Sequence, residues 1–316
     1  MIAVNPSNRK LLRFPFRAVG AVLIVAIGFF VIPASFKATG QASKHETDAD
    51  YLRVMTFNIR YDEPRDNENA WPNRKKFVAS MIRFHHADLV GVQEALKRQL
   101  DDLAVLLPEY SWVGVGRADG KASGEFSAIL YRKSRFKSLE SSTFWLSETP
   151  NIPSKGWDAS YPRIVTWVKL KDTKTGKVFF HFNTHFDHRG VRARKESARL
   201  LLDRIRQTVA NLPVVVTGDF NFTESSDGYQ LLTGKNSETS MSSDSALRDT
   251  RYASQHDHHG PTSTFNEFKA LVPGMKIDYV FVKGRIRVVQ HGALSDTWDG
   301  RFPSDHLPVL TEIVIE

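Results

Sequence analysis

The sequence contains no cysteine among its 316 residues. A disulfide framework, a cysteine-ligated zinc site, a thiol nucleophile and a lipid-modified N-terminal cysteine are therefore excluded. The chain also lacks a repeat with a period of about 20–50 residues, which argues against a solenoid or a propeller. A dense basic stripe with interleaved aromatic residues is missing as well, since the clearest basic stretch, RGVRARK at 189–195, is short. This last absence disfavours a nucleic-acid-binding surface.

The net charge is +8, and it is unevenly distributed. Residues 1–50 contain six basic and three acidic side chains, and residues 51–316 contain 37 basic and 32 acidic ones. A mild positive excess suits a phosphate-bearing substrate, although soluble proteins tolerate it without any such function. Hydrophobic residues make up 41% of the chain and charged residues 25%, so its composition is that of an ordinary globular protein.

Residues 1–42 are predicted to be an export segment. A basic cluster from Arg9 to Arg17 precedes an apolar run from Ala18 to Phe36, and no charge follows before Lys37. The dense part of this run has the length of a signal-peptide core, and the full run is just long enough to span a membrane. Basic residues on its N-terminal flank predict that this end stays in the cytoplasm and the remaining chain lies outside it.

Two outcomes are open for this segment. Small residues at Gly40 and Ala42 offer a cleavage site before Ser43, which would release a periplasmic or secreted protein. Without cleavage, residues 18–36 would anchor the protein in the inner membrane. Residues 43–50 are small, polar and charged and form the predicted linker, and residues 51–316 form the predicted domain.

From residue 51 onward, strand-like and helix-like segments alternate. Apolar runs rich in β-branched and aromatic residues predict strands at 52–59, 87–94, 126–132, 163–170, 178–186, 213–220, 277–282 and 306–315. Apolar residues at helical spacing predict helices at 73–86, 96–107 and 192–210. Residues 221–275 are polar and irregular, and a loop region of that length in a compact domain is usually functional. The pattern predicts an α/β domain with more strands than a doubly wound fold has.

Polar residues at the ends of apolar strands are the most informative pattern, because a packed core gives no reason for them. Each one alone is more simply explained as a cap, a turn residue or a hydrogen-bonded core residue. Six strand ends that together supply carboxylates, amides and imidazoles are not explained in that way. The residues are Asn58, Glu94, His185, Asp187, Asp219, Asn221, Asp278, Asp305 and His306.

These side chains match what hydrolysis of a phosphate ester requires. Glu94 and the amide oxygen of Asn58 are hard oxygen ligands of the kind that Mg²⁺ prefers. Asp219 and Asn221 lie two residues apart, so on a strand both would point to the same face. One of them can accept a proton from water while the other orients that water or contacts the phosphate.

The histidines suit complementary roles. His306 follows Asp305 and can be oriented by Asp278, because an imidazole tautomer needs a fixed partner. His185 adds a second imidazole, which can bind non-bridging phosphate oxygens and offset the charge that develops in the transition state.

The strings TFNIRYD, LVGVQE, NTHFDH, GDFN, IDYVFV and SDHLPV occur in this order along the chain. In this order they resemble the endonuclease/exonuclease/phosphatase superfamily, which includes deoxyribonuclease I, abasic-site endonucleases, bacterial sphingomyelinases, inositol-polyphosphate phosphatases and deadenylases. The resemblance covers about residues 51–316. It implies an α/β (α+β) fold, a four-layer sandwich in which two mixed β-sheets pack face to face with helices on the outside.

The resemblance also implies roles for the matching residues. The base is either Asp219 or His306 in mechanisms proposed for the family, and we assign Asp219. The expected cofactor is Mg²⁺ or Mn²⁺. The implied metal ligands are Glu94, Asn58 and Asp305, and the implied catalytic residues are Asp219, His306, His185, Asn221 and Asp278.

Further strings, among them GEFSAILYR, TFWLSETP and GWDA, resemble a bacterial subgroup of secreted or membrane-linked members. In this subgroup Arg163 is expected to bind the substrate phosphate through its forked guanidinium, although a structural ion pair explains such an arginine equally well. Asp187 would either belong to the substrate site or stabilise the loop after His185. For the run HDHHGPTSTF at 256–265, the resemblance implies a wall of the substrate pocket that would include His259. A transition-metal site is the less favoured interpretation, because such sites usually gather ligands from two elements.

Three functions remain compatible with these residues. The favoured one is metal-dependent hydrolysis of a phosphomonoester or phosphodiester on a small or lipid-linked substrate outside the cytoplasm, by in-line attack of water. The alternatives are a secreted or membrane-anchored nuclease and a catalytically idle binding module on the same fold. The idle module is disfavoured, because every acidic residue and histidine of the family motifs is present in this chain. We expect a monomer, and the substrate itself stays undetermined.

Overall fold

The computed structural model describes residues 51–235 and 246–316, which belong to one compact unit. The predicted export segment and linker lie outside the described residues and stay predictions. Within the described residues, none of the helices has the length and apolar character needed to cross a membrane.

The first sheet has six strands in the order β11-β12-β1-β2-β4-β3. Strands β1 and β2 are parallel, and every other neighbouring pair is antiparallel. Helix α1 (Trp71–Phe84) forms the crossover between the two parallel strands and is preceded by a short 3₁₀ helix (Pro64–Asn69). The strands are β1 (Tyr51–Asn58), β2 (Leu89–Ala95), β3 (Tyr110–Val113), β4 (Phe126–Arg132), β11 (Ile286–Ala293) and β12 (Val309–Ile315).

The second sheet repeats this plan with the order β5-β6-β7-β8-β10-β9. Only β7 and β8 are parallel, and helix α3 (Val191–Val209) connects them. The strands are β5 (Phe136–Trp145), β6 (Ile164–Asp172), β7 (Val178–His185), β8 (Val214–Asp219), β9 (Arg248–Asp249) and β10 (Asp278–Lys283).

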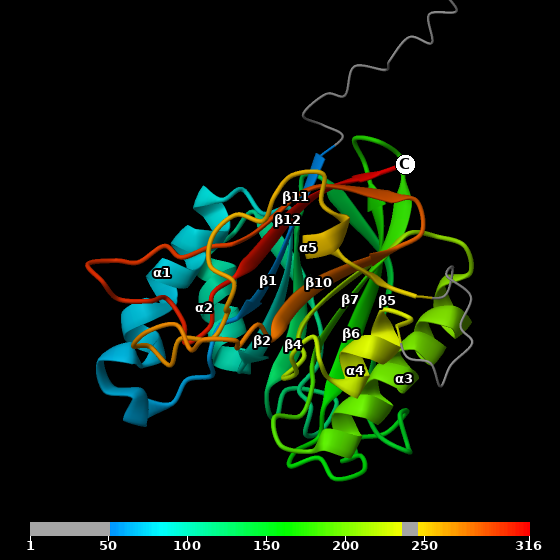
Figure 1. The fold of residues 1–316 in the computed structure, drawn as a ribbon. Helices are drawn as coiled ribbons and strands as arrows, with labels where there is room; N and C mark the ends of the chain where they lie inside the picture. The colour runs from blue at the N-terminus through cyan, green and yellow to red at the C-terminus, as the bar shows by residue number, and fades with distance from the viewer. Residues whose placement is uncertain (1–50, 236–245) are drawn as a thin grey trace, which may run out of the picture. The chain divides into compact units, whose positions relative to one another are not determined.

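Three buried hydrophobic layers separate four layers of secondary structure (Figure 1). Helices α1 and α2 (Lys97–Leu106) cover the outer face of the first sheet, and α3 and α4 (Asp227–Leu232) cover the outer face of the second. The layer between the sheets consists largely of β-branched and leucine side chains, such as Val54, Leu89 and Val215. The predicted four-layer sandwich is therefore confirmed.

Four strands, β3, β5, β9 and β11, were not predicted from the sequence. Strand β5 lies at a sheet edge and exposes most of its middle residues, so its sequence FKSLESSTFW has no run of apolar positions. Strands β3 and β11 are also edge strands. The region predicted as irregular contains α4, β9 and a short helix α5 (Thr250–Ala253), with residues 236–245 lying outside the described part.

A buried group of hydrogen-bonded side chains joins the two sheets at their centre. The amide nitrogen of Asn183 on β7 donates to the main-chain carbonyls of Val92 and Ala128 in the other sheet, at 2.9 Å each. Its oxygen accepts from the side chains of Gln93 at 2.7 Å and Thr217 at 3.0 Å. Asn183 thus uses both halves of its amide in bonds that keep the two sheets in register with each other.

The sheets approach each other closely beside this group. A Cβ atom at Gly91 would lie 2.1 Å from the Thr217 hydroxyl oxygen and 2.5 Å from the Asn183 amide oxygen. Only glycine therefore leaves room for the polar bridge between β2 and the second sheet.

Substitution Asn183→Ala should lower the free energy of unfolding by at least about 3 kcal/mol, because several buried polar groups would lose their partners at about 1–3 kcal/mol each. The melting temperature should fall by roughly 2–4 °C per kcal/mol in a domain of this size. The matched control is Asn211→Ala at an exposed position, which should change stability by less than about 0.5 kcal/mol. Equal melting temperatures for the two variants in a calorimetric scan would contradict this account.

Candidate active site

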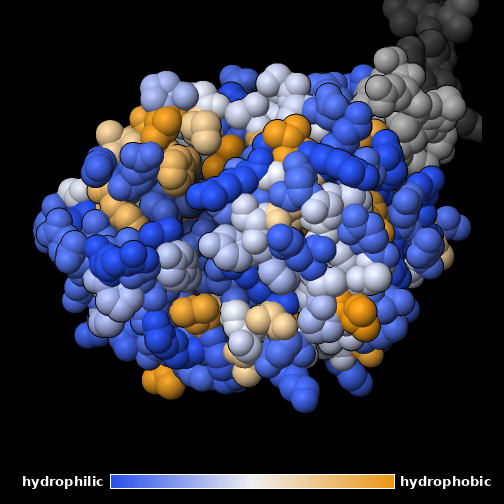
Figure 2. Space-filling model, turned by 90° about the horizontal axis from the view of Figure 1, so that it is seen from below, coloured by the Kyte–Doolittle hydropathy of each residue, from blue (hydrophilic) through white to orange (hydrophobic). Residues whose placement is uncertain are grey.

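The polar strand ends meet at one end of the sandwich because of the direction of the two parallel strand pairs. Strands β1 and β2 end together, as do β7 and β8. Strands β12 and β10 run antiparallel to β1 and β8, so each begins where its neighbour ends. Figure 2 looks onto this end, where hydrophilic residues predominate and hydrophobic ones form scattered patches. The side chains gathered here are Asn58, Glu94, His185, Asp219, Asn221, Asp278, Asp305 and His306.

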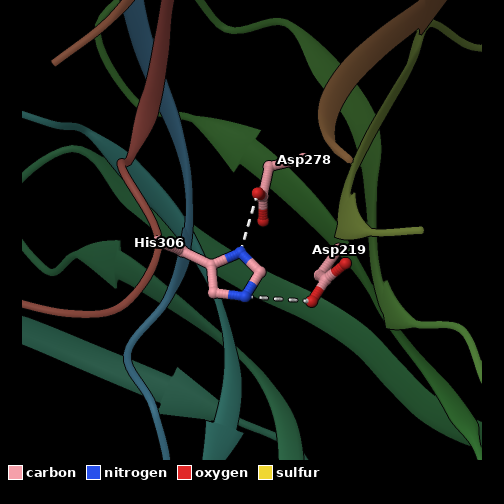
Figure 3. Close-up of side chains that lie close together, drawn as sticks. All are labelled: Asp219, Asp278 and His306. Carbon is pink, nitrogen blue, oxygen red and sulfur yellow. Dashed lines mark hydrogen bonds and ion pairs between the residues drawn. The ribbon is translucent and has the colours of Figure 1, made fainter. Parts of the chain in front are cut away.

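The centre of the site is the His306 imidazole, which lies between two aspartates (Figure 3). Its Nδ1 is 2.8 Å from Oδ2 of Asp278, and its Nε2 is 3.8 Å from Oδ2 of Asp219. All three side chains are buried. One potential ligand atom from each lies within 4.8 Å of the others, so the three could also hold a metal ion.

Burial and charge act in opposite directions on this group. Burial lowers the pKa of His306, but the charges of Asp278 and Asp219 outweigh it and hold the pKa well above its usual value. Burial, followed by the charge of Asp278, raises the pKa of Asp219 to about 7. The imidazole is therefore cationic at neutral pH, while Asp219 gains or loses its proton there.

Asp278 is held from the opposite side by Thr264, whose hydroxyl donates to Oδ2 at 2.6 Å. The other carboxylate oxygen of Asp278 is buried and has no hydrogen-bond partner among the described residues. This arrangement fixes the orientation of the His306 ring, as carboxylate partners of histidine commonly do.

Asn58 connects Asp219 to Glu94. Its amide nitrogen donates to Oδ2 of Asp219 at 3.0 Å and to Oε1 of Glu94 at 3.1 Å, while its oxygen accepts from the main-chain nitrogen of Arg60 at 2.9 Å. The predicted use of the amide oxygen as a metal ligand requires a half-turn of this amide. Burial raises the pKa of Glu94, but the Asn58 hydrogen bond and the His306 charge outweigh it, so the net pKa is lowered and the carboxylate is charged.

Asp305 adds a further carboxyl group on the Glu94 side of the site. Burial raises its pKa, and the charge of Glu94 raises it further against the opposing effect of His306. One terminal nitrogen of Arg60 lies 3.9 Å from Oδ2 of Asp305. Two neighbouring carboxylates whose mutual repulsion is incompletely offset fit a divalent cation with oxygen ligands.

Three site segments have strained backbones. Arg60, Glu94 and Asn221 have φ values of 56°, 62° and 50°, in the left-handed region that non-glycine residues rarely adopt. At Glu94 the pairing of β2 with β4 also shifts register between Val92 and Ala95, so the side chain is re-aimed by a bulge. Strain of this kind is commonly found where side-chain position matters for function.

His185 presents an unused donor. Burial, then the charges of Arg163 and Arg117, hold its pKa well below the usual value, so the ring is neutral. Its Nε2 accepts from the amide of Asn221 at 2.9 Å. Its Nδ1 therefore carries the proton, and this buried atom has no hydrogen-bond partner among the described residues. Nδ1 lies 4.0 Å from Oε2 of Glu125, and on the other side of the ring Nε2 lies 3.4 Å from Oδ2 of Asp219.

Arg163 lines the same small cavity as His185. Its Nε donates to Asp187 at 3.2 Å, and one terminal nitrogen lies 3.0 Å from Nδ1 of His188. The other terminal nitrogen is buried without a partner in the described part of the chain. Arg163 and His185 thus each leave a nitrogen atom without a partner at one cavity of about 10 Å³, which has room for about one water molecule.

Asp187 lies behind Arg163 rather than in the cavity. Its two oxygens accept from Arg163 and from the main-chain nitrogens of Ser160, Arg189 and Gly190. Burial opposes these bonds, but together they lower its pKa to about 2. Of the two roles considered for Asp187, its contacts correspond to stabilising the loop after His185.

The structure does not bring His259 to this group of residues. Its main chain bridges to Gly292 at the outer edge of the first sheet, and its side chain is exposed. His258 belongs to the same predicted pocket wall. Its Nδ1 lies within hydrogen-bond distance of Nδ1 of His291, at 2.9 Å. The contact between His259 and the substrate stays a prediction.

Comparison with known proteins covers the part of the chain that carries these residues. A model of the endonuclease/exonuclease/phosphatase family matches residues 55–306. The chain belongs to this family.

Solved family structures of Bacteroides proteins cover nearly the same length. The protein from Bacteroides vulgatus is 41% identical with a TM-score of 0.78, covering 84% of this chain and 99% of its own. The mannosyl-6-phosphatase from Bacteroides thetaiotaomicron is 37% identical with a TM-score of 0.77, covering 83% of this chain and 99% of its own. The catalytic domain of human Nocturnin shares the fold at 20% identity, with a TM-score of 0.64 and coverages of 84% and 94%.

Two uncharacterised proteins of Acanthamoeba polyphaga mimivirus are also similar in sequence. One is 26% identical over 180 residues, which is 54% of this chain and 67% of that protein. The other is 22% identical over 288 residues, and the match spans 39% of its length.

Several residues of this endonuclease/exonuclease/phosphatase domain were not predicted from the sequence. Arg117 and Glu125 line the cavity beside His185 and pair with each other through two hydrogen bonds of 2.6 and 2.8 Å. Glu125 lies within the GEFSAILYR string, but a charged residue just before a strand has many simpler explanations. Thr264 lies in the long irregular region, where no periodic pattern distinguishes one hydroxyl from another.

The raised pKa of Asp219 predicts a pH-dependent cost to stability. Its folded value of about 7 exceeds the ordinary value of 3.8, so stability falls as pH rises between these values. In the presence of a chelator, Asp219→Asn should therefore melt no lower than the wild type at pH 8, and its relative stability should decline towards pH 4.

The matched control is Asp249→Asn, which alters a buried carboxylate paired with Lys276 at 2.9 Å. This variant should melt below the wild type at pH 8, because it removes a buried ion-pair partner. A lower melting temperature for Asp219→Asn at pH 8 than for Asp249→Asn would contradict the electrostatic account of the site.

Proposed function

We propose that this domain is a divalent-metal-dependent phosphoesterase that hydrolyses phosphate esters of small molecules. The observation that carries the proposal is the placement of Asp219, with a pKa of about 7, beside two unused N–H donors and a cationic histidine. A carboxylate of this kind can take a proton from water at neutral pH while the donors hold the phosphate.

Asp219 is the better candidate for the general base. His306 holds its proton at neutral pH, because Asp278 and Asp219 raise its pKa, and a protonated imidazole cannot accept another. Its Nδ1–H group donates to Asp278, and its Nε2–H group, on the side of Asp219, can offset negative charge at the reacting phosphate. Asn221 fixes the His185 ring, so that Nδ1 of His185 points into the cavity shared with Arg163.

Glu94, Asp305 and Asn58 would hold the metal ion in this proposal. A bound Mg²⁺ or Mn²⁺ would neutralise phosphate oxygens and so make the phosphorus more open to attack. Burial and the charge of nearby Glu94 raise the pKa of Asp305, and a cation bound between the two carboxyl groups would relieve this repulsion, which supports the location.

A small substrate is favoured over nucleic acid. The sequence has no dense basic stripe, and the similar Bacteroides thetaiotaomicron protein is a mannosyl-6-phosphatase. TDP2 of D. rerio, which was solved in complex with a single-strand DNA product, is 17% identical to this chain, so its likeness supports the fold alone.

The purified protein should hydrolyse at least one substrate in a panel of sugar phosphates, nucleotides, phosphoinositides, sphingomyelin, RNA and plasmid DNA with Mg²⁺ or Mn²⁺. A chelator should abolish the activity, and Asp219→Asn should lower kcat by about 10²–10⁴-fold. Glu94→Gln should also lose the rise in melting temperature that added Mn²⁺ gives the wild type.

The control for the metal ligand is Glu140→Gln, since Glu140 is exposed on β5. This variant should keep both the activity and the Mn²⁺-dependent rise in melting temperature. Full activity of Glu94→Gln after exhaustive chelation would remove the metal assignment, and cleavage of DNA alone would favour the nuclease alternative.

We also propose that the domain works outside the cytoplasm, on the basis of the basic and apolar pattern at residues 9–36. Alkaline phosphatase fused after residue 50 should be active in a bacterial host, because that enzyme matures only after export. A reporter that is active only in the cytoplasm, fused at the same position, should stay silent, and the opposite pattern would overturn the topology.

A further inference from the structure

The end of the sandwich opposite the active site, which we call the basic end, is the upper end in Figure 1. Strand β1 begins there, and two short connections join the sheets there, residues 133–135 between β4 and β5 and residues 284–285 between β10 and β11. With two flanking residues on each side, the connections and strand ends at this end contain 11 basic and 4 acidic residues. The segments counted are 51–52, 83–90, 105–111, 131–137, 171–179, 208–215, 282–287 and 314–316.

The positive charge of the domain is concentrated at the basic end. Residues 51–316 contain 37 basic and 32 acidic side chains in all, so 26 basic and 28 acidic ones are left for the rest of the domain. The basic end therefore has a net charge of +7 and the remainder a net charge of −2. A charge distribution of this kind attracts an anionic surface and orients the domain towards it.

Several of these cations are available to a partner. Lys171, Lys174 and Arg285 are exposed, and none of the three has an ion-pair partner among the described residues. The acidic residues of this end do not neutralise them, because Glu109 and Asp172 pair with other arginines of the same end, at 3.0 and 3.1 Å. The exposed charge at the basic end is thus positive.

The basic end also contains a hollow of about 700 Å³, which gives the charges a concave surface. Its lining includes four basic and two acidic residues, besides two histidines. Tyr51, the first residue of β1, and the exposed Lys174 both line it. Beside it, Phe84 at the end of α1 is 72% exposed. Basic residues together with an exposed aromatic side chain are typical of surfaces that bind at a membrane interface.

The sequence before Tyr51 indicates which anionic surface is near the basic end. The apolar run at residues 18–36 is predicted to enter a membrane, and only residues 37–50 separate it from β1. These 14 residues span at most about 50 Å when fully extended. A membrane that holds the apolar run would therefore lie within reach of the point where the chain enters the domain.

We propose that the basic end binds the anionic head groups of a phospholipid membrane, so that the active site at the opposite end faces away from that membrane. The inference goes beyond the proposed phosphoesterase function and does not depend on it. Each Lys or Arg near an anionic membrane strengthens binding by about fivefold, so a few exposed cations are enough to orient a domain that its own chain keeps nearby.

The absence of cysteine allows a fluorescent label to be placed at one chosen position of the full chain. Ser134→Cys places the label at the basic end, and Ser123→Cys places it at an exposed position in the loop before β4, at the active-site end. The labelled chains are reconstituted into vesicles of phosphatidylcholine and phosphatidylglycerol in equal parts, with a nitroxide quencher on some head groups. The label at position 134 should be quenched and the label at position 123 should not.

The charge of the membrane should decide this result. Quenching at position 134 should be lost in vesicles of phosphatidylcholine alone, and also at about 1 M salt, where the Debye length falls to about 3 Å. Equal quenching of the two labels, or quenching at position 134 that is the same in both kinds of vesicle, would overturn the proposal. Release of the label by inorganic phosphate, when chloride at the same ionic strength has no effect, would assign the basic end to a small soluble anion instead.

Charge reversal tests the residues themselves. The triple variant Lys171→Glu, Lys174→Glu and Arg285→Glu should lose the quenching at position 134. The matched control reverses three exposed cations at the active-site end, Lys121→Glu, Lys155→Glu and Arg192→Glu, and so changes the net charge by the same amount. The control should keep the quenching, and an equal loss in both triple variants would show that net charge alone, and not the basic end, decides the contact.

Discussion

The direction of two parallel strand pairs is the constraint on which the rest of this structure depends. Each sheet has only one parallel pair, β1 with β2 and β7 with β8, and each pair is joined by a helix. The strands of a parallel pair end at the same edge, and here both pairs end at the same end of the sandwich. Four separate segments therefore deliver Asn58, Glu94, His185 and Asp219 to one place. Asp278 is the first residue of β10, and His306 lies just before β12. Both therefore join the same site.

Because the strand ends meet, several carboxyl groups are gathered in one site, and this is unfavourable for folding. Asp219, Asp278, Asp305 and Glu94 are removed from water within one site, and the pKa values of Asp219 and Asp305 rise as a result. The polar bridge of Asn183 and the three hydrophobic layers supply the stability that tolerates this repulsion. A site of this kind is unfavourable when empty and complementary to a cation and a phosphate group, which is a common relation between stability and function.

The rim of the site is positioned by residues that do not face the substrate cavity. Asp187 holds Arg163 and the Ser160 main chain, and Asn221 holds His185. Trp145 holds the loop that carries Arg117. These contacts leave a nitrogen atom of Arg163 and one of His185 without a partner at one small cavity, where the proposed function would place an oxygen of the phosphate.

The sequence by itself determined the fold class, the family and the polar residues at the strand ends, because apolar strands leave a visible pattern wherever a polar residue interrupts them. The spacing of Asp219 and Asn221 predicted that they share a strand face, but β8 ends at Asp219 and Asn221 has a left-handed φ of 50°. Only the tertiary structure decided which of these groups are partners, since the contacts between Asn58 and Asp219 or between Asp278 and His306 join segments distant in the chain. It alone revealed the Arg117–Glu125 pair and the role of Asp187 behind Arg163. The edge strand β5 was not predicted from the sequence either. A strand exposed to water carries no apolar alternation by which it can be recognised.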